Sequence, residues 1–359
     1  MSVFLMAGGG TGGHVVPSLA VARELRRRGH DPFFIGTRKG MEASLVPAEG
    51  FPIEYIEIGG LKRVGLLRTI QTLWQLPLSV VDANEMMRKR RPAAVFSMGG
   101  YAAAPVMIAA FLRGVPVVVM EPNAMPGLTS RRFGRWVDRA LLSFEEAVRF
   151  FPSGKTEITG LPVRREFFEI QPKQRKSTDP VTILVTGGSR GSRTLNKAAR
   201  GAWELFRKSS LRIYLIHQTG QEDYEEISRA FSQAGVPGEV TPFINDMPAQ
   251  FARADIIVGR SGAGAVAEIA AAGKPSILVP FPFAADDHQY YNAKALMDAG
   301  AARLVRDAEM NGERFFQEIQ DLVSQPGLLE RMGNAARAFA RPGAAERAAD
   351  ILENLSFRP

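Results

Sequence analysis

Short apolar runs alternate with longer amphipathic segments over the first third of the chain. The runs that predict buried strands are residues 3–7, 31–36, 53–58, 94–97 and 115–120. The segments with helical character are residues 15–28, 41–48, 66–90 and 102–113, and a break is expected near Pro77 in the third of them. This repeated alternation predicts an α/β fold with a parallel sheet that is covered by helices on both faces.

The alternation weakens between residues 150 and 180, where Pro and Gly residues punctuate a stretch that becomes polar and basic. Such composition is typical of a linker between domains. The pattern then restarts, with a strand expected at 181–186, a glycine-rich turn at 187–191, a helix from about 194 and a strand at 211–216. We therefore expect two similar domains, at residues 1–163 and 164–342, because the length of 359 residues exceeds that of one typical domain.

The stretch from residue 256 to 279 is the most informative part of the second half. An apolar run at 256–258 is followed by Ser261-Gly262, an Ala-rich helix to residue 272, and a second apolar run from Pro275. Free backbone N–H groups and the helix dipole at such a helix start favour a phosphate. Glu268, farther along the helix, would reach a sugar hydroxyl of the same ligand; the alternative interpretation is an ordinary solvent-facing Glu.

Composition narrows the classes of function. The chain is 45% hydrophobic and 23% charged, as soluble globular proteins are, and it has no Cys, so disulfides and thiolate chemistry are excluded. A net charge of +8 suggests an acidic partner. Nucleic acid is the least supported partner, since the basic residues cluster at predicted helix ends and no nucleic-acid-binding motif accompanies them.

No signal peptide is recognisable at the N-terminus, so we expect a cytoplasmic protein. The uncharged segment 93–112 is interpreted as a strand, a turn and a helix rather than a membrane span.

A glycine loop follows the first strand, and Gly8, Gly10 and Gly13 match the dinucleotide fingerprint. The acidic residue that NAD requires is missing after the second strand, where Arg38 stands instead, so NADP remains a minor alternative and no cofactor is expected. His14 opens the following helix. It is either an ordinary polar residue at a helix start or a base whose neutral form the helix dipole favours.

Metal sites have little support in the sequence. The chain has four His residues far apart in sequence and no Asp-x-Asp motif. Asp286, Asp287 and His288 offer oxygen and nitrogen ligands, but solvated loop residues are the better interpretation. Ser153 to Thr156 resembles the end of a phosphate-binding loop, yet Arg149 stands where its first Gly is required.

Residues 61–78 mix apolar and basic side chains. The apolar positions expected to form a surface patch are Leu66, Leu67, Ile70, Leu73 and Trp74. A core helix and a membrane-surface helix for anionic lipid both fit this pattern.

Motifs spread over nearly the whole chain resemble one family. They are Gly9-Gly10-Thr11-Gly12-Gly13-His14, Met98-Gly99-Gly100-Tyr101, Glu121-Pro122-Asn123, Pro162-Val163-Arg164, Gly187-Gly188-Ser189-Arg190-Gly191, Phe243-Ile244-Asn245-Asp246-Met247, Arg260-Ser261-Gly262-Ala263 with Glu268, and His288-Gln289. The chain is similar to the MurG family, the bacterial UDP-N-acetylglucosamine:lipid I N-acetylglucosaminyltransferases of glycosyltransferase family 28. The resemblance implies the GT-B fold, with two facing Rossmann-like domains and a C-terminal helix, about residues 343–359, that crosses back to the first domain.

The resemblance also implies roles for individual residues. Ile244 would meet uracil through its backbone, Glu268 the ribose hydroxyls, and Gln289 with His288 the sugar hydroxyls. The residues implied to hold the diphosphate or complete the donor site are Ala263, Gly264, Ala265, Val266, Ala267, Ser189, Arg164, Thr11, Gly12, Gly13 and Asn123. His14 is the first candidate for the base and Glu121 the second. The first glycine loop would take the pyrophosphate of the acceptor.

The implied reaction is displacement with inversion at the anomeric carbon, in which the C4 hydroxyl of the acceptor attacks and UDP leaves without a metal. The expected partners are UDP-N-acetylglucosamine, lipid I, an anionic membrane surface at the cytoplasmic face of the inner membrane, and other cell-wall synthesis proteins. Two positions depart from the family pattern, Pro122 where Gln is frequent and Leu161 where Asn is frequent. The rival interpretations are a UDP-N-acetylglucosamine 2-epimerase of the same fold and a non-catalytic nucleotide-sugar-binding scaffold.

Overall fold

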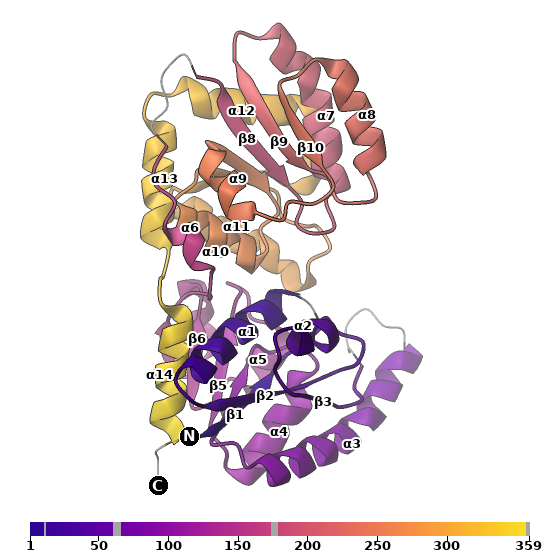
Figure 1. The fold of residues 1–359 in the computed structure, drawn as a ribbon, viewed down its shortest axis with the longest axis vertical. Helices are drawn as coiled ribbons and strands as arrows, with labels where there is room; N and C mark the ends of the chain where they lie inside the picture. The colour runs from indigo at the N-terminus through magenta and orange to yellow at the C-terminus, as the bar shows by residue number, and fades with distance from the viewer. Residues whose placement is uncertain (11, 60–65, 174–178, 357–359) are drawn as a thin grey trace. The chain divides into compact units, whose positions relative to one another are not determined.

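The computed structural model describes residues 1–10, 12–59, 66–173 and 179–356, with the main chain alone for 66–73 (Figure 1). The chain divides into two compact units. The first comprises Met1–Pro162 with Arg341–Pro359, and the second comprises Val163–Ala340. Each unit is an α/β domain built on a parallel sheet, as the alternating pattern predicts.

The sheet of the first unit has seven strands in the order β3-β2-β1-β4-β5-β6-β7, and every described pairing is parallel. The strands are β1 (Val3–Ala7), β2 (Asp31–Gly36), β3 (Ile53–Tyr55), β4 (Ala94–Ser97), β5 (Val117–Glu121), β6 (Arg139–Leu142) and β7 (Thr156–Ile158). The direction in which successive strands are added reverses between β1 and β4. The loops after β1 and β4 therefore both start at the carboxyl edge of the sheet and run to opposite faces, and open α/β sheets bind ligands at such a position.

Helices cover this sheet on both faces. They are α1 (Gly12–Arg27), α2 (Glu42–Ala48), α3 (Leu66–Arg90), α4 (Ala103–Arg113), α5 (Leu128–Phe133), the 3-10 helix Glu145–Phe150 and α14 (Ala344–Ser356). The break expected at Pro77 is wrong, because α3 runs through it. Pro77 lies on the exposed side of the helix, and the Ser79 hydroxyl donates to the Gln75 carbonyl in the same turn, at 2.8 Å. A Pro ring on the solvent side is tolerated there by local adjustment of the helix.

The C-terminal helix α14 packs on α1 in the first unit, as the family resemblance implies. Arg28 donates to Asp350 and to Glu353 at 2.7 and 2.8 Å. His30 lies 2.7 Å from Glu353, and Arg347 forms a bidentate pair with Glu157. Arg28 and Glu353 are 325 positions apart in the sequence. These charged side chains therefore fix the C-terminal helix to the domain that the N-terminal part of the chain forms.

The second unit has a six-stranded parallel sheet in the order β10-β9-β8-β11-β12-β13. Its strands are β8 (Val181–Thr186), β9 (Ile213–Gln218), β10 (Gly238–Thr241), β11 (Ile256–Gly259), β12 (Ser276–Leu278) and β13 (Ala302–Leu304). Its helices are α6 (Arg165–Phe168), α7 (Arg193–Lys208), α8 (Tyr224–Ala234), α9 (Met247–Arg253), α10 (Ala263–Ala272), α11 (His288–Asp298), α12 (Gly312–Ser324) and α13 (Leu328–Phe339), with 3-10 turns at Ala285–Asp287 and Asp307–Glu309.

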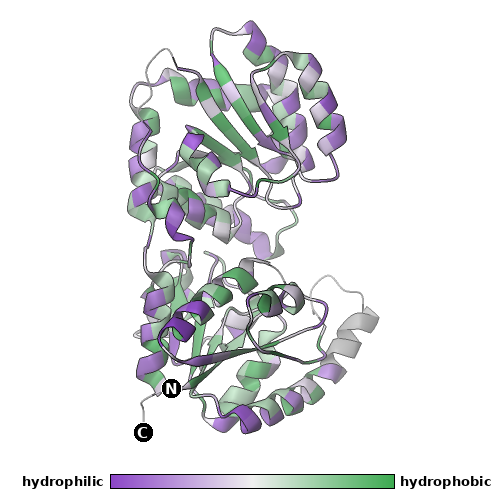
Figure 2. Ribbon diagram, viewed as in Figure 1, coloured by the Kyte–Doolittle hydropathy of each residue, from purple (hydrophilic) through white to green (hydrophobic). Residues whose placement is uncertain are grey.

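Apolar strands form the core of each unit, and the helices turn polar faces outward (Figure 2). The uncharged segment that resembles a membrane span divides into β4, a turn and α4, because two Gly residues with positive φ, Gly99 and Gly100, interrupt it. None of the helices within the described residues combines the length and the apolar character that crossing a bilayer requires.

Candidate functional site

A cavity of about 450 Å³ opens in the second unit at the carboxyl ends of β8, β9 and β11. Its walls come from the loops after these strands, from Arg164 at the N-cap of α6, and from α9, α10 and α11. The lining residues are Arg164, Thr186, Gly187, Gly188, Ser189, Gln218, Phe243, Ile244, Asn245, Met247, Phe251, Ile257, Gly259, Arg260, Gly262, Ala265, Glu268, Ile269 and Gln289. This is the edge of a parallel sheet at which ligands of open α/β folds bind.

The start of α10 presents bare backbone to the cavity. Gly262 is the N-cap residue and lacks a side chain that would accept from the first turn, and the helix ladder begins with the bond from Val266 N–H to Gly262 O at 3.0 Å. A Cβ added to Gly262 or to Gly264 would meet no neighbouring group within 4 Å, so the space beside both glycines is open. The uncapped N–H groups of this first turn can therefore be approached closely by an anion, which the helix dipole also favours.

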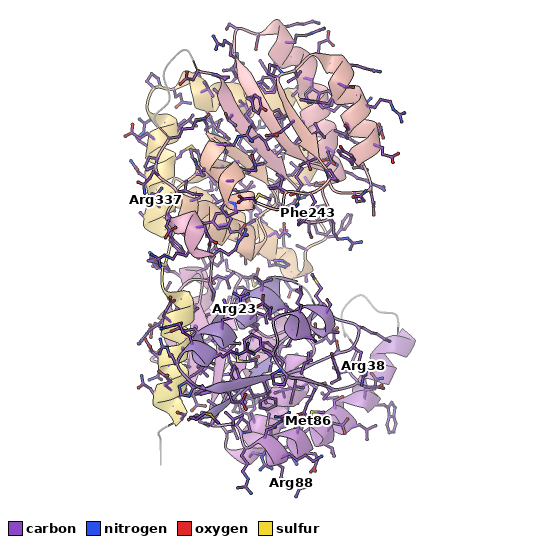
Figure 3. The ribbon with its side chains drawn as sticks, in the orientation of Figure 1. Arg23, Arg38, Met86, Arg88, Phe243 and Arg337 are labelled. Carbon is purple, nitrogen blue, oxygen red and sulfur yellow. The ribbon has the colours of Figure 1, made fainter. Side chains whose placement is uncertain are left out.

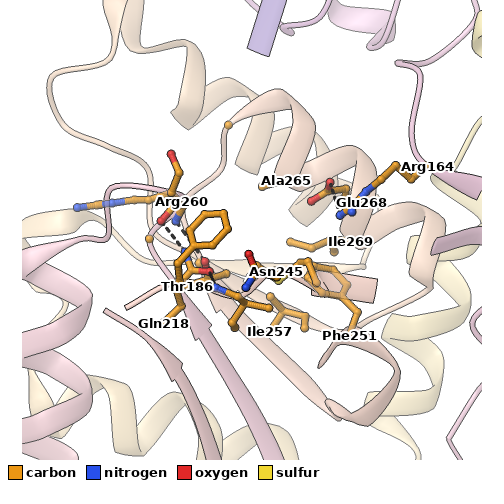
Figure 4. A pocket seen from close by; sticks show the side chains of 18 of the residues that line it. Arg164, Thr186, Gln218, Asn245, Phe251, Ile257, Arg260, Ala265, Glu268 and Ile269 are labelled. Atoms are coloured by element: carbon orange, nitrogen blue, oxygen red, sulfur yellow. Dashed lines mark hydrogen bonds and ion pairs between the residues drawn. The ribbon is translucent and has the colours of Figure 1, made fainter. Parts of the chain in front are cut away.

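Glu268 lies about 7.5 Å along the helix axis from Ala263, given 1.5 Å of rise per residue. Arg164, the residue just before α6, approaches it with 4.0 Å between Nη2 and Oε1 (Figure 4). Burial raises the pKa of Glu268 from 4.5 to about 7, and the Arg164 charge offsets this only in part. About 31% of the Glu268 side chain is still accessible through the mouth of the cavity. The site thus holds a reachable carboxylate in a poorly solvated position.

The opposite end of the cavity is organised by Gln218, which the sequence did not single out. Its Nε2 donates to Gly188 O at 2.7 Å and its Oε1 accepts from Ile244 N–H at 3.0 Å. One buried amide therefore fixes both the glycine-rich loop and the loop that carries Ile244. Since the Ile244 N–H is engaged, its carbonyl is the group left to accept from a planar base. Phe243 beside it is 50% exposed, at the rim (Figure 3).

Gln289 is held at the start of α11. Its side-chain oxygen accepts from Phe281 N–H at 3.0 Å, which directs the amide –NH2 group elsewhere, and its carbonyl accepts from the Ser261 hydroxyl at 2.8 Å. The preceding Asp286 and Asp287 have φ of 54° and 53°, a strained conformation for residues other than Gly. His288 turns its Nδ1 to Ala285 O at 2.8 Å and does not line the cavity.

The structure gathers six of the predicted donor-site residues around this cavity, namely Arg164, Ser189, Ile244, Ala265, Glu268 and Gln289. Ala263, Gly264 and Ala267 lie in the same helix α10, whereas the Val266 side chain is buried in the core. The sequence assigned no site role to Thr186, Gln218, Asn245 or Arg260, which also line the cavity. Asn245 and Arg260 stand in motifs that carry the family resemblance, whereas the signal for Thr186 and Gln218 was their position at strand ends in a sheet whose order was unknown.

The remaining predicted residues belong to the first unit. Thr11 lies outside the described residues, and Gly12, Gly13 and His14 form the first turn of α1. His14 Nδ1 faces Gly9 O at 3.4 Å.

Glu121, at the end of β5, is 2% exposed. It accepts from Asn123 N–H at 3.1 Å and from Gly127 N–H at 3.2 Å, while burial raises its pKa. Its oxygens therefore fix the loop that carries Asn123.

The predicted apolar patch lies on α3, where the side chains of Leu66, Leu67, Ile70 and Leu73 are outside the described residues. Trp74 is 77% exposed. One and two turns farther on, Leu78 and Val81 are 68% and 64% exposed, so the described apolar stripe continues beyond the predicted segment. Arg88 lies at the end of the same helix (Figure 3).

The part of the chain that the structure describes brings no three His, Asp or Glu side chains together as a metal site.

Comparison with protein families matches both halves of the chain. Residues 4–142 match the glycosyltransferase family 28 N-terminal domain, and residues 182–355 match the glycosyltransferase family 28 C-terminal domain. The second match includes α14, which packs in the first unit.

Similar proteins cover nearly the whole chain. The UDP-N-acetylglucosamine--N-acetylmuramyl-(pentapeptide) pyrophosphoryl-undecaprenol N-acetylglucosamine transferase of Solibacter usitatus is 62% identical over 98% of this chain and 96% of its own. That of Myxococcus xanthus is 40% identical over 99% and 93%. The crystal structure of Acinetobacter baumannii MurG is 31% identical, with a TM-score of 0.85 over 99% and 100% of the two chains. A UDP-GlcNAc 2-epimerase from Neisseria meningitidis, at 15% identity and a TM-score of 0.64, shares the fold alone. The chain belongs to glycosyltransferase family 28 and, within it, to the family of the UDP-N-acetylglucosamine--N-acetylmuramyl-(pentapeptide) pyrophosphoryl-undecaprenol N-acetylglucosamine transferases.

Proposed function

We propose that this chain transfers N-acetylglucosamine from UDP-N-acetylglucosamine to the C4 hydroxyl of the N-acetylmuramyl unit of lipid I, with inversion, to give lipid II. The observation that carries the proposal is the 62% identity to a transferase of this name over 98% of the chain. The cavity of the second unit supports it, since an uncapped helix start, a carboxylate farther along the helix and an amide at the next helix suit a diphosphate, a ribose and a sugar.

In the donor site we assign the diphosphate to the first turn of α10, from Ala263 to Ala267, with Ser189 and Arg164 beside it. Glu268 accepts from the ribose hydroxyls, and the Ile244 carbonyl accepts from the uracil ring. Gln289 reads the sugar hydroxyls with its –NH2 group, and His288 is a secondary contact. Thr11, Gly12, Gly13 and Asn123 are contributions of the first unit that rest on the family resemblance. Charge on the departing diphosphate is stabilised by the helix start and by Arg164.

We assign the general base to His14. Its imidazole stands in the first turn of α1, and with the proton on Nδ1, which faces Gly9 O at 3.4 Å, such a ring accepts a proton at Nε2. Glu121, the second candidate, is enclosed and engaged by backbone N–H groups, so we assign it the task of fixing the loop with Asn123.

We propose that the stripe Trp74, Leu78 and Val81 on α3 rests on the anionic surface of the membrane that holds the polyprenyl tail of lipid I. Each side chain is more than half exposed, which is costly in water and favourable in a bilayer interface. Leu112 at the end of α4 is also 75% exposed, and Arg113 next to it donates to Asn84 of α3. Arg113 supplies positive charge for acidic lipid headgroups, whereas Arg88 is paired with Glu85 on the same helix. We therefore expect the protein at the cytoplasmic face of the inner membrane, where other cell-wall synthesis proteins are further partners.

The test is release of UDP from UDP-N-acetylglucosamine with and without a lipid I analogue, in the presence of EDTA. Release that depends on the acceptor, with lipid II as product, is the expected result. Release without acceptor would favour an epimerase or hydrolase, and tight UDP binding without release would favour a scaffold. A Glu268→Gln variant provides the control, since its effect on donor affinity ties turnover to the cavity of the second unit.

A further inference from the structure

A buried carboxylate lies under the glycine loop of the first unit and has no part in the mechanism above. Glu42, the first residue of α2, is 1% exposed. Its Oε2 accepts from Gly10 N–H at 2.8 Å. Its Oε1 accepts from Thr37 N–H at 2.9 Å and from the Thr37 hydroxyl at 2.8 Å. Three donors from the loops that follow β1 and β2 therefore converge on one carboxylate.

Glycines around Glu42 leave the space that its side chain occupies. A Cβ added to Gly9, Gly36 or Gly40 would overlap the Glu42 carboxylate or its stem. In a dinucleotide-binding domain, the glycines of this loop allow a pyrophosphate to approach the backbone. Here the absence of glycine side chains leaves room for the carboxylate of Glu42, which belongs to the chain itself. The Gly10 N–H donates its hydrogen bond to this carboxylate.

Contacts lead from Glu42 to two neighbouring side chains. Gly9, which packs on Glu42, offers its carbonyl to His14 Nδ1 at 3.4 Å. Because a carbonyl only accepts, the proton in this contact lies on Nδ1. The Thr37 hydroxyl lies 3.4 Å from the Tyr101 hydroxyl, and a Cβ on Gly10 would lie 3.1 Å from the Tyr101 ring. The backbone that Glu42 holds is thus the surface against which His14 and Tyr101 rest.

We propose that Glu42 is a positioning residue, an internal anion that takes the place of a bound phosphate in the glycine loop of the first unit. It excludes a nucleotide phosphate from the backbone at Gly9 and Gly10 and fixes the backbone that orients His14. The second part rests on the proposed function, in which His14 is the base. It also revises the expectation for the acceptor: its pyrophosphate does not bind at Gly9 and Gly10, where a second anion would meet Glu42 at close range without an intervening donor.

The first experiment compares Glu42→Gln with Glu49→Gln, which removes an exposed carboxylate near the end of the same helix. A Gln amide in place of Glu42 keeps one accepting oxygen and sets its –NH2 group against either the Gly10 N–H or the Thr37 N–H, which also donates, so we expect kcat to fall about tenfold or more. The dissociation constant of UDP, whose site is in the other unit, should stay within about twofold, and Glu49→Gln should keep its kcat. Unchanged kcat in Glu42→Gln, or a parallel loss of UDP affinity, would overturn the proposal. Thr37→Val, which removes one donor and keeps Glu42, serves if Glu42→Gln does not fold; a wild-type kcat there also overturns it.

The second experiment does not depend on turnover. Long-range ¹H–¹⁵N spectra of protein labelled at its four His residues report the tautomer of each ring, and His14→Ala assigns the signal of His14. We expect the Nδ1–H tautomer for His14 in the wild type and a mixture in Glu42→Gln. The same tautomer in both proteins would overturn the inference. Absence of transferase activity in the wild type would instead refute the proposed function and leave this comparison valid.

Discussion

If Glu268 binds the ribose as proposed, its raised pKa should make donor binding depend on pH. Burial raises this pKa from 4.5 to about 7, so the carboxyl group is about half ionised at neutral pH. Two ribose hydroxyls need both oxygens as acceptors, which only the ionised form provides. UDP binding should therefore favour the ionised form and lower the pKa of Glu268, with release of a proton.

The magnitude follows from the ionised fraction. With a pKa of about 7, that fraction is about 0.9 at pH 8 and about 0.09 at pH 6. If UDP binds only the ionised form, the dissociation constant should rise about tenfold between these pH values, which is ~1.4 kcal/mol. Glu268→Gln cannot ionise, so its affinity should lack this dependence and should be weaker at pH 8 by the loss of a charge-assisted hydrogen bond, about 1.5–3 kcal/mol.

Isothermal titration calorimetry with UDP at pH 6, 7 and 8 measures this effect. The phosphates of UDP titrate in the same range, but they do so identically with both proteins and cancel in the ratio of the two dissociation constants. Repeating the pH 7 titration in buffers of different ionisation enthalpy counts the released protons, and we expect about half a proton more for the wild type than for the variant. A ratio that is constant from pH 6 to pH 8 would refute the assignment of Glu268 to the ribose.

Three further predictions concern other parts of the molecule. His14→Ala should lower kcat about 10²–10⁴-fold with unchanged UDP affinity, measured by UDP release and calorimetry; near-normal turnover would remove His14 as the base. Leu78→Glu should weaken binding to anionic vesicles about tenfold or more while turnover of a water-soluble acceptor stays constant, whereas Met297→Glu, an exposed apolar position of the second unit, should leave vesicle binding unchanged. Arg27 and Arg28 lower the pKa of Glu24 from 4.5 to about 2, so this carboxylate stabilises the fold above pH 4.5 and loses that contribution as the pH falls through 2. Glu24→Gln should thus cost about 1–2 kcal/mol of unfolding free energy at pH 7 in urea titrations, a difference that should vanish near pH 2.

The strands of both units show which strands can be predicted from the pattern of apolar positions and which cannot. Long apolar runs such as Val3–Ala7 and Val181–Thr186 are confirmed as strands, because each is buried on both faces of a parallel sheet. The strands β6, β7, β10 and β13 were not predicted. They are short, contain Arg, Glu or Gly, and form because a neighbouring strand offers them a partner, as Val119 does for Ala140. Pairing energy of that kind does not appear in the local sequence.

The elements of the proposed donor site could also be predicted in part from the sequence. The strand, Gly cap and Ala-rich helix around Ser261 and Glu268 follow from local rules of helix initiation and termination, and their agreement with α10 is close. Gln218 could not be found in this way. It lies at the end of β9 and acts by joining Gly188 to Ile244, which are 30 and 26 residues away from it.

The amino-acid sequence by itself determined the α/β class, the positions of most helices and strands, and the family, because periodicity, capping and motif order are properties of neighbouring residues. Only the tertiary structure decided what each polar group meets. It brought Glu42 under Gly10, turned Leu78 and Val81 to solvent, and raised the pKa of Glu268. The reason is physical: hydrogen bonding between distant segments and the exclusion of water depend on how strands are ordered in a sheet, and that order arises from packing of the whole chain.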